Sequence, residues 1–243
     1  MGNWVVVPPT GPVDEAVIDR RTNQSWIVHV EPFELATTVV TQLQWTAILP
    51  TPPSGEDRPQ VDVSWRDAVL FCNELSRRQE LTPVYDISTR PVETPTRWRP
   101  HREPDRDEWV VTWNQAADGY RLPTDAEWQV ACRAGSTGPR YAPLPDVGWY
   151  QANSNGQLPL VGVKLPNRWG LHDMLGGVWE WCWDLFDEDV YGPYRIIRGG
   201  GWNDPHWSCR AGVRRKTNPV ARFDDLGFRL ARNAVSSLGQ ATT

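Results

Sequence analysis

Glycine, asparagine and proline recur every few residues beyond Gly135, and this spacing is the strongest constraint on the fold. These residues interrupt helices and strands, so the second half of the chain is predicted to consist of short strands joined by ordered loops. Fifteen tryptophans occur in the same chain. Because a buried tryptophan needs an acceptor for its indole N–H, we expect the carbonyls of irregular loops to serve these side chains.

Two segments predict helices. In VSWRDAVLFCNELSRRQ, Ser64 precedes the helix and Asp67 follows three residues later, and RLPTDAEWQVACRAG repeats the pattern with Thr124 and Glu127. This spacing is typical of a capping box at a helix N-terminus. In the first segment, apolar side chains fall on one helical face, at Trp65, Ala68, Val69, Cys72 and Leu75. Cys72 is therefore predicted to lie in the core.

The remaining pattern favours one α+β domain. Residues 26–49 begin with strand-like alternation and change to helical spacing from about Thr38. The segment 86–118 mixes prolines and charges before the strand-like WVVTW, which indicates an exposed insertion that returns as a hairpin arm. We interpret His101, Glu103 and Asp105 within it as solvated loop charges rather than metal ligands. No internal repeat or linker occurs, so one domain is predicted over residues 1–243.

Composition and charge exclude several classes of protein. The net charge of −5 argues against a nucleic-acid footprint, and we interpret the basic run Arg210–Lys216 as a solvated strand face. No stretch approaches the roughly 20 apolar residues that cross a bilayer. The N-terminus lacks a basic, apolar secretion signal and the myristoylation pattern, so a cytoplasmic location is expected. Four cysteines without CxxC spacing are too few for a disulfide scaffold.

Four motifs occur in a characteristic order: RLPTDAEWQVACRAG, NRWGLHDMLGGVWEWCWD, RIIRGGGW and NPVARFDDLGFRLAR. In this order the chain resembles the formylglycine-generating enzyme, or sulfatase-modifying factor, family over about residues 26–232. The resemblance implies that family's variant of the C-type lectin fold, an α+β domain with little regular secondary structure, two helices and small antiparallel sheets. The family includes copper-dependent oxidases, sulfoxide-forming domains, pyoverdine-maturation proteins, immunity proteins and variable ligand-binding proteins, so it constrains the fold more than the function.

The motif HDMLGGVWEW has the chemistry of a calcium site. Asp173 and Glu180 bracket a glycine pair, and two carboxylates with backbone oxygens suit a hard cation. The resemblance implies structural calcium held by Asp173, the carbonyls of Gly176 and Val178, and Glu180. In the alternative interpretation, Asp173 caps a turn and Glu180 pairs with an arginine. A second family calcium site is not expected, because Asn153 is its sole clear candidate ligand.

The stretch GGGWNDPHWSC departs from the oxidases of the family, which carry GGS followed by two copper-binding cysteines. The resemblance places Gly201 at the position of this serine, Asp204 at that of the first cysteine and Cys209 near that of the second. One thiol does not make the two-sulfur site that copper(I) prefers, so formylglycine generation and a redox copper or iron cofactor are not expected. His206 lacks an evident second histidine among His29, His101 and His172 for a facial iron triad. Cys132 and Cys209 are expected to be neighbouring buried thiols.

Two functions remain open. The first is a calcium-stiffened recognition module that binds a protein, peptide or small molecule through its C-terminal loop face, with no nucleic-acid or membrane partner. The second is a metal-dependent tailoring enzyme of specialised metabolism, in which Asp204, His206 and Cys209 would line the pocket. Aromatic and arginine side chains of the kind that dominate interfaces accompany these residues. The candidate ligand-binding set is Trp202, Asp204, His206, Trp207, Arg214, Arg215 and Phe223.

Overall fold

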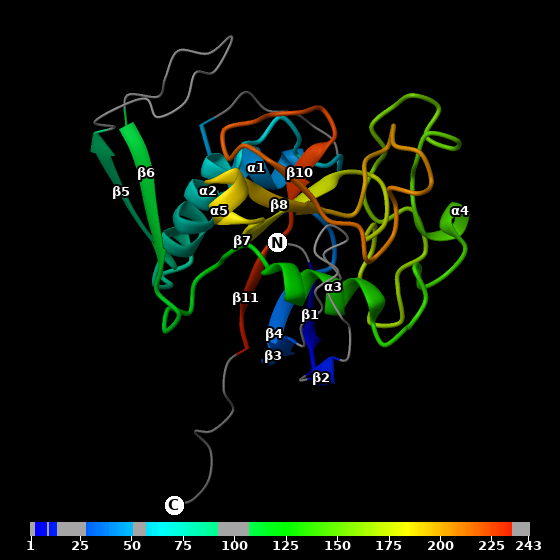
Figure 1. Ribbon diagram of the computed structural model, residues 1–243, viewed down its shortest axis with the longest axis horizontal. Coiled ribbons are helices and arrows are strands. Elements are labelled where there is room, and N and C mark those ends of the chain that lie inside the picture. The colour runs from blue at the N-terminus through cyan, green and yellow to red at the C-terminus, as the bar shows by residue number, and fades with distance from the viewer. Residues whose placement is uncertain (1–2, 9, 14–27, 51–56, 92–106, 235–243) are drawn as a thin grey trace, which may run out of the picture.

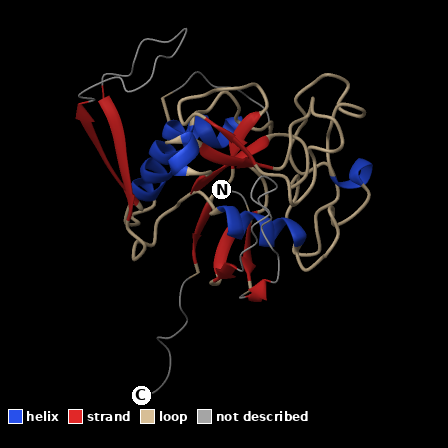
Figure 2. Cartoon of the chain, in the orientation of Figure 1, coloured by secondary structure: helices blue, strands red, loops and turns tan. Residues whose placement is uncertain are grey.

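A computed structural model describes residues 3–8, 10–13, 28–50, 57–91 and 107–234. Short helices and strands are separated by long loops, which make up much of the ribbon in Figure 2. None of the helices in these ranges is long and apolar enough to cross a membrane. The elements therefore match the predicted α+β pattern of little regular secondary structure.

A three-stranded antiparallel sheet joins the two ends of the described chain. β1 (Trp4–Val7) and β11 (Ala231–Asn233) flank β4 (Phe33–Ala36), and all pairs are antiparallel. The same residue of β4, Phe33, is opposite Val7 on one side and Asn233 on the other. In Figure 1 the blue β1 and β4 and the red β11 lie together below the centre of the molecule.

The second sheet carries the elements around the C-terminal loops. Its order is β10 (Leu226–Phe228), β7 (Trp179–Leu185), β8 (Arg195–Arg198) and β9 (Arg215–Thr217). β10 pairs with β7 in parallel, whereas the other two pairs are antiparallel. This parallel pair is the one departure, among the described strands, from the expected antiparallel sheets.

Two isolated hairpins complete the strands. β2 (Thr10–Val13) pairs with β3 (Val28–Val30), and β5 (Tyr85–Pro91) pairs with β6 (Asp107–Trp113). The β5–β6 pair stands off the body of the molecule at the left of Figure 1, which agrees with the predicted arm. His101, Glu103 and Asp105 lie outside the described residues.

Both predicted capping boxes are formed. α2 (Trp65–Arg78) has Ser64 as its N-cap with Asp67 reciprocating, and α3 (Asp125–Arg133) has Thr124 with Glu127. α3 ends where Ala134 adopts a left-handed conformation, just before Gly135. Three further helices are shorter: α1 (Gln42–Ile48), α4 (Leu144–Val147) and α5 (Glu188–Tyr191). The two longest described helices are thus the two that the sequence predicts.

Buried tryptophans find acceptors in the way that their chemistry requires. The indole N–H of Trp65 donates to the carbonyl of Cys182 at 3.1 Å, and that of Trp181 donates to the carbonyl of Val63 at 2.8 Å. Both rings lie in one hydrophobic cluster together with Cys72, which is fully buried as predicted. These bonds fasten α2 and the chain before it to β7.

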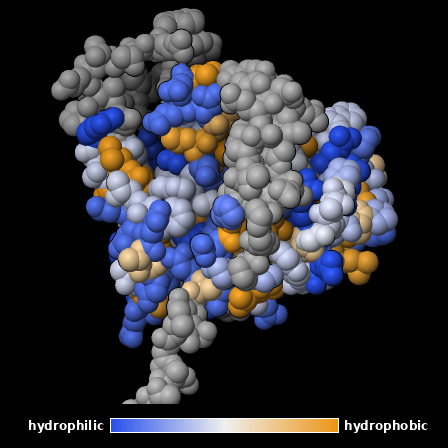
Figure 3. All heavy atoms as spheres, turned by 60° about the horizontal axis from the view of Figure 1, so that its bottom comes forward, coloured by the Kyte–Doolittle hydropathy of each residue, from blue (hydrophilic) through white to orange (hydrophobic). Residues whose placement is uncertain are grey.

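Loops between α3 and β10 form one side of the molecule. In Figure 1 the yellow-green loops around α4 and the orange loops after β8 lie together at the right. Figure 3 shows a face on which hydrophilic residues prevail and apolar residues are scattered in small groups. We call the segments 133–173 and 204–225 on this side the loop lobe.

Candidate functional site

The glycines after β8 fix the path of the candidate loop. Gly199 and Gly200 both have left-handed backbones, with φ of 98° and 91°. A β-carbon on Gly200 would lie 2.8 Å from the Sγ of Cys209, so a side chain there would collide with the thiol. Glycine is therefore required at Gly200 by both backbone conformation and packing.

Asp204 is the hub of this loop. Its Oδ2 accepts the indole N–H of Trp179 at 2.6 Å and the backbone N–H of Gly201 at 2.9 Å. Its Oδ1 lies 3.5 Å from the guanidinium of Arg215, whose carbon sits 4.7 Å from the Trp179 ring centroid. The residue at the first cysteine position of the oxidases is thus a carboxylate that ties the loop to β7 and β9.

Cys209 lies beneath this hub and is fully buried. Loss of solvation, reinforced by the charge of Asp204, raises the pKa of its thiol to about 12. The thiol is therefore protonated at neutral pH, and a protonated thiol is a poor nucleophile and metal ligand. Cys209 and Cys132 share one hydrophobic cluster, and all four cysteines are free.

The exposed part of the loop presents aromatic side chains. Trp207 is 55% exposed and its ring makes an edge contact with the exposed His206. Phe223 is 47% exposed, and the neighbouring Asp224 carbonyl accepts the indole N–H of Trp202 at 3.2 Å. These contacts, with the hydrogen bond from Arg215 to Ser208 at 2.9 Å, link most of the candidate set into one face, which we call the loop face.

Arg214 is turned away from that face. Its Nε lies 2.7 Å from the carboxylate of Asp125, and its guanidinium carbon lies 5.1 Å from the Phe186 ring centroid. Asp125 also accepts a hydrogen bond from the fully buried Arg198 at 2.5 Å. Arg214 therefore belongs to an internal ion-pair network, although neighbouring Arg215 faces the loop.

Asp225 adds a second carboxylate to the loop face. Loss of solvation raises its pKa to about 6, and the charges of Asp204 and Asp224 add to this effect. The side chain of Asp225 packs against Gly201, where no β-carbon intervenes. Sequence reasoning missed Asp225, although its neighbour Phe223 was a candidate.

One of the predicted calcium ligands, Glu180, forms a buried ion pair with Arg229. The carboxylate of Glu180 accepts from Arg229 through Nε at 3.0 Å and Nη2 at 2.8 Å, and from the Trp128 indole at 2.8 Å. Both charged side chains are fully buried. The pairing of Glu180 with an arginine is the alternative that the sequence left open, and Arg229 is the residue that supplies it.

Asp173 has one free oxygen. Its Oδ2 accepts the backbone N–H of Gly162 at 2.6 Å, whereas its buried Oδ1 has no hydrogen-bond partner. A carboxylate offers about four acceptor positions, so Glu180, with three donors, keeps about one. Each carboxylate thus keeps an open acceptor, and Arg229 offsets the negative charge that would hold a cation there.

Among the described residues, the histidines are not grouped with other metal-ligating side chains. His29 is exposed, and the Nδ1 of His172 lies 2.9 Å from the carbonyl of Lys164. Within the described ranges, no group of three or more histidine, cysteine, aspartate or glutamate side chains is arranged to hold a metal ion. Asn153 uses its amide to close a turn, accepting from the Tyr150 N–H and donating to the Gly148 carbonyl.

Small sheets, short capped helices and ordered loops beside the C-terminal strands define the formylglycine-generating-enzyme type of the C-type lectin fold. The chain belongs to the family of sulfatase-modifying factor enzyme 1-like domains, whose model matches residues 3–234. The resemblance predicted from the four motifs is thereby confirmed.

Three similar proteins bear on function. Chaperone protein LppX of Paenibacillus barcinonensis is 34% identical over 85% of this chain and 82% of its own length. Formylglycine-generating enzyme of Streptomyces coelicolor is 33% identical over 54% of each chain. Among solved structures, Treponema denticola variable protein 1 has a TM-score of 0.76 and 30% identity over 95% of this chain and 94% of its own.

Proposed function

We propose that this protein is a recognition module that binds a polypeptide through its loop face, and that it does not generate formylglycine. The observation that carries the proposal is the hydrogen-bonded position of Asp204. Its carboxylate occupies the sequence position of the first oxidase cysteine and is already bonded to Trp179 and Gly201. The remaining thiol, Cys209, is buried and protonated at neutral pH.

The side chains that remain on the loop face support binding. Trp207 and Phe223 are exposed apolar side chains of the loop face, and the Arg215 side chain of the same face is 48% exposed. Tryptophan and arginine are enriched among the residues that dominate interface energies. The loop beneath them is held by a hydrogen bond from the Gly201 N–H to the Asp204 carboxylate and by one from Arg140 to the Cys209 carbonyl, which lowers the entropy cost of ordering the loop on binding. One relative is named a chaperone, and chaperones act on other polypeptides.

Calcium has a supporting role in this proposal. We expect the free Oδ1 of Asp173 and loop carbonyls, including those of Gly176 and Val178, to bind the cation, with the remaining acceptor of Glu180. Bound there, calcium would stiffen the turn that precedes β7, on which Trp179 is the first residue. The cation would act on the scaffold and not on the partner.

Selection of short random peptides displayed on phage tests the proposal. Wild-type protein should enrich peptides that lose binding to Trp207→Ala and Phe223→Ala. Leu43→Ala is the matched control, because Leu43 is similarly exposed, on α1. Failure to enrich any peptide, or equal loss of binding in the Leu43 variant, would overturn the proposal. Formation of aldehyde on a sulfatase-type cysteine peptide by the copper-loaded protein would overturn its second part.

A further inference from the structure

Charge is distributed very unevenly along this chain. The loop lobe contains nine of the twenty-five lysines and arginines and five of the thirty aspartates and glutamates. The rest of the chain therefore combines sixteen basic residues with twenty-five acidic ones. In a protein with a net charge of −5, the lobe that carries the loop face thus has a formal charge of +4 and the remainder −9.

Some of these cations are neutralised within the molecule. Arg214 pairs with Asp125, Arg215 lies 3.5 Å from Asp204, and Arg222 lies 2.6 Å from a carboxylate oxygen of Asp67. Lys164 instead lies 4.1 Å from the Trp149 ring centroid and donates to a backbone carbonyl. These residues explain part of the positive charge as internal structure.

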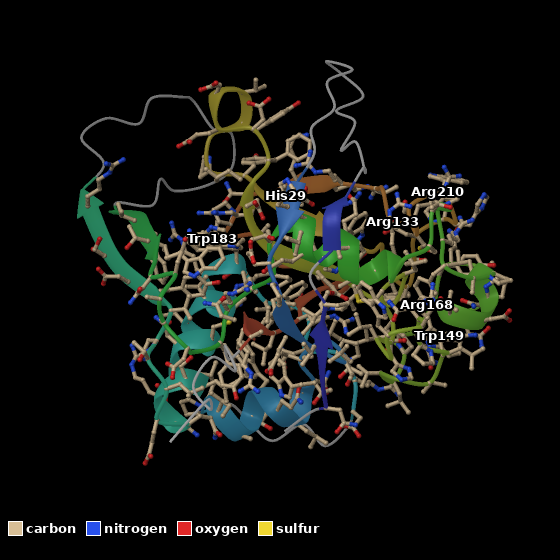
Figure 4. All side chains as sticks on the ribbon, turned by 90° about the horizontal axis from the view of Figure 1, so that it is seen from below. His29, Arg133, Trp149, Arg168, Trp183 and Arg210 are labelled. Atoms are coloured by element: carbon tan, nitrogen blue, oxygen red, sulfur yellow. The ribbon has the colours of Figure 1, made fainter. Side chains whose placement is uncertain are left out.

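Three arginines of the lobe have no carboxylate partner among the described residues: Arg140, Arg168 and Arg210. Arg168 is exposed, and a β-carbon on Gly135, just after α3, would lie 3.4 Å from its Nη1. Arg210 is half-buried, and its Nε is a buried atom that has no hydrogen-bond partner. Figure 4 shows Arg168 and Arg210 on the same side of the molecule as Arg133.

Arg140 braces the loop that carries both Trp207 and Arg210. Its guanidinium donates to the carbonyl of His206, which precedes Trp207, and to the carbonyl of Cys209, which precedes Arg210. The backbone N–H of Ala211 donates to the carbonyl of Pro139 at 2.9 Å, which joins the same two segments. An exposed indole and an unpaired guanidinium are therefore presented from one braced loop.

From this arrangement we infer that the loop lobe recognises an acidic segment of a partner polypeptide, with Arg168 and Arg210 binding its carboxylates and Trp207 packing on an adjacent apolar side chain. The inference rests on the proposed function and names the chemistry of its partner. Guanidinium groups bind carboxylates through two parallel hydrogen bonds, which is the contact we assign to the exposed Arg168 and to the accessible part of Arg210.

A polypeptide fits this surface better than a nucleic acid does. Phosphate backbones require many uncompensated cations along a groove, whereas several of the lobe's cations are already held by carboxylates or rings. Two guanidiniums without carboxylate partners, on the lobe that also carries the exposed Trp207, match a short cluster of aspartates or glutamates next to an apolar residue. The acidic remainder of the chain would also repel a polyanion that extended beyond the lobe.

Fluorescence polarisation with defined probes tests the inference. The probes are a labelled glutamate-rich peptide with one leucine, the same peptide with glutamine in place of glutamate, and single-stranded oligo(dT). We expect the glutamate peptide to bind most tightly. Arg168→Gln/Arg210→Gln should weaken it by about tenfold or more, because each lost charge-assisted hydrogen bond contributes about 1.5–3 kcal/mol and tenfold is about 1.4 kcal/mol.

Matched controls separate the inference from the proposed function. Arg77→Gln/Arg78→Gln removes the same charge from α2 and should change the affinity less than about twofold, because these arginines pair with Glu74 and the C-terminal end of α2 lies away from the loop lobe (Figure 1). Arg168→Gln alone tests the exposed group if the double variant fails to fold. Equal binding of the glutamine peptide, tighter binding of oligo(dT), or equal loss in the α2 variant would overturn the inference. Phage selection that enriches Trp207-dependent peptides without acidic residues would overturn it while leaving the proposed function intact.

Discussion

Gly201 lies directly against the carboxylate of Asp225. A β-carbon on Gly201 would approach the Oδ2 of Asp225 to 2.3 Å and its Cβ and Cγ to 2.9 Å. The oxidases of the family carry serine at this position, so the two arrangements exclude each other without a movement of Asp225. The loop face is therefore built around an acidic side chain where the oxidase pattern places a hydroxyl.

Replacing Gly201 by serine should destabilise the protein. We expect a loss of about 1–3 kcal/mol in the free energy of unfolding, because the added atoms overpack the contact with Asp225. Urea denaturation measures the change. Gly212→Ala is the control, since the nearest atom to a β-carbon there is 3.8 Å away. Gly201→Ser/Asp225→Gly should lose less than the two single variants together, and simple additivity would contradict the steric explanation.

Removing one partner of the Glu180–Arg229 pair should be much more costly. Arg229→Met leaves the buried carboxylate of Glu180 without its cation, and such changes typically cost about 3–5 kcal/mol. Chemical denaturation of this variant beside Glu74→Gln gives the comparison, because Glu74 pairs with arginines on the exposed surface of α2. Similar free energies of unfolding for the two variants would show that the buried pair does not stabilise the fold more than a surface pair does.

Calcium binding should depend on Asp173. Calorimetric titration is expected to show weak binding, in the range of about 10⁻⁴–10⁻³ M, because Arg229 offsets one of the two nearby carboxylates. Asp173→Ala should abolish the heat of binding, whereas Asp146→Asn on the exposed surface of α4 should not. Absence of binding to the wild-type protein would mean that Glu180 and Arg229 form a closed pair with no room for a cation.

Cys209 should resist alkylation in the folded protein. Its pKa is raised to about 12, so the thiolate is scarce at pH 8, and burial blocks access as well. Mass spectrometry after iodoacetamide treatment is expected to show no modification of the four cysteines in the native state and complete modification in urea. Rapid labelling of Cys209 in the native protein would restore it as a candidate nucleophile.

Stability should also fall as the pH rises through 6 because of Asp225. Its pKa in the folded protein is about 6, above the ordinary value near 3.8 that it regains on unfolding. The protonated carboxyl therefore favours the folded state below pH 4, and this contribution is lost as pH rises through 6. Asp225→Asn should raise the thermal midpoint relative to wild type at pH 7.5 but not at pH 4. An equal difference at both values would contradict the assignment.

Local patterns in the sequence were sufficient for the helices and for the family. The capping boxes at Ser64 and Thr124 each depend on two residues three positions apart, and both form as predicted. The buried environment of Cys72 likewise followed from the spacing of one amphipathic helix. Features of this kind need no knowledge of how distant segments meet.

Contacts between distant segments could not be predicted in the same way. The indole of Trp179 and the carboxylate of Asp204 are 25 residues apart, and β10 meets β7 in parallel from across the loop lobe. Arg214 and Arg215 are adjacent and chemically alike, yet one joins an internal ion pair and the other faces the loop. Their roles depend on how β9 is seated beside β8, which no local pattern specifies.

The position of β4 between β1 and β11 has a consequence for biosynthesis. Arg229 donates a hydrogen bond to the carbonyl of Ala36, which it follows by 193 positions, and β11 closes on the same strand. A chain emerging from the ribosome cannot complete this sheet until the residues through Asn233 have been translated. Closure of the sheet therefore comes long after β1 and β4 have been synthesised, and β4 lacks its β11 partner until then.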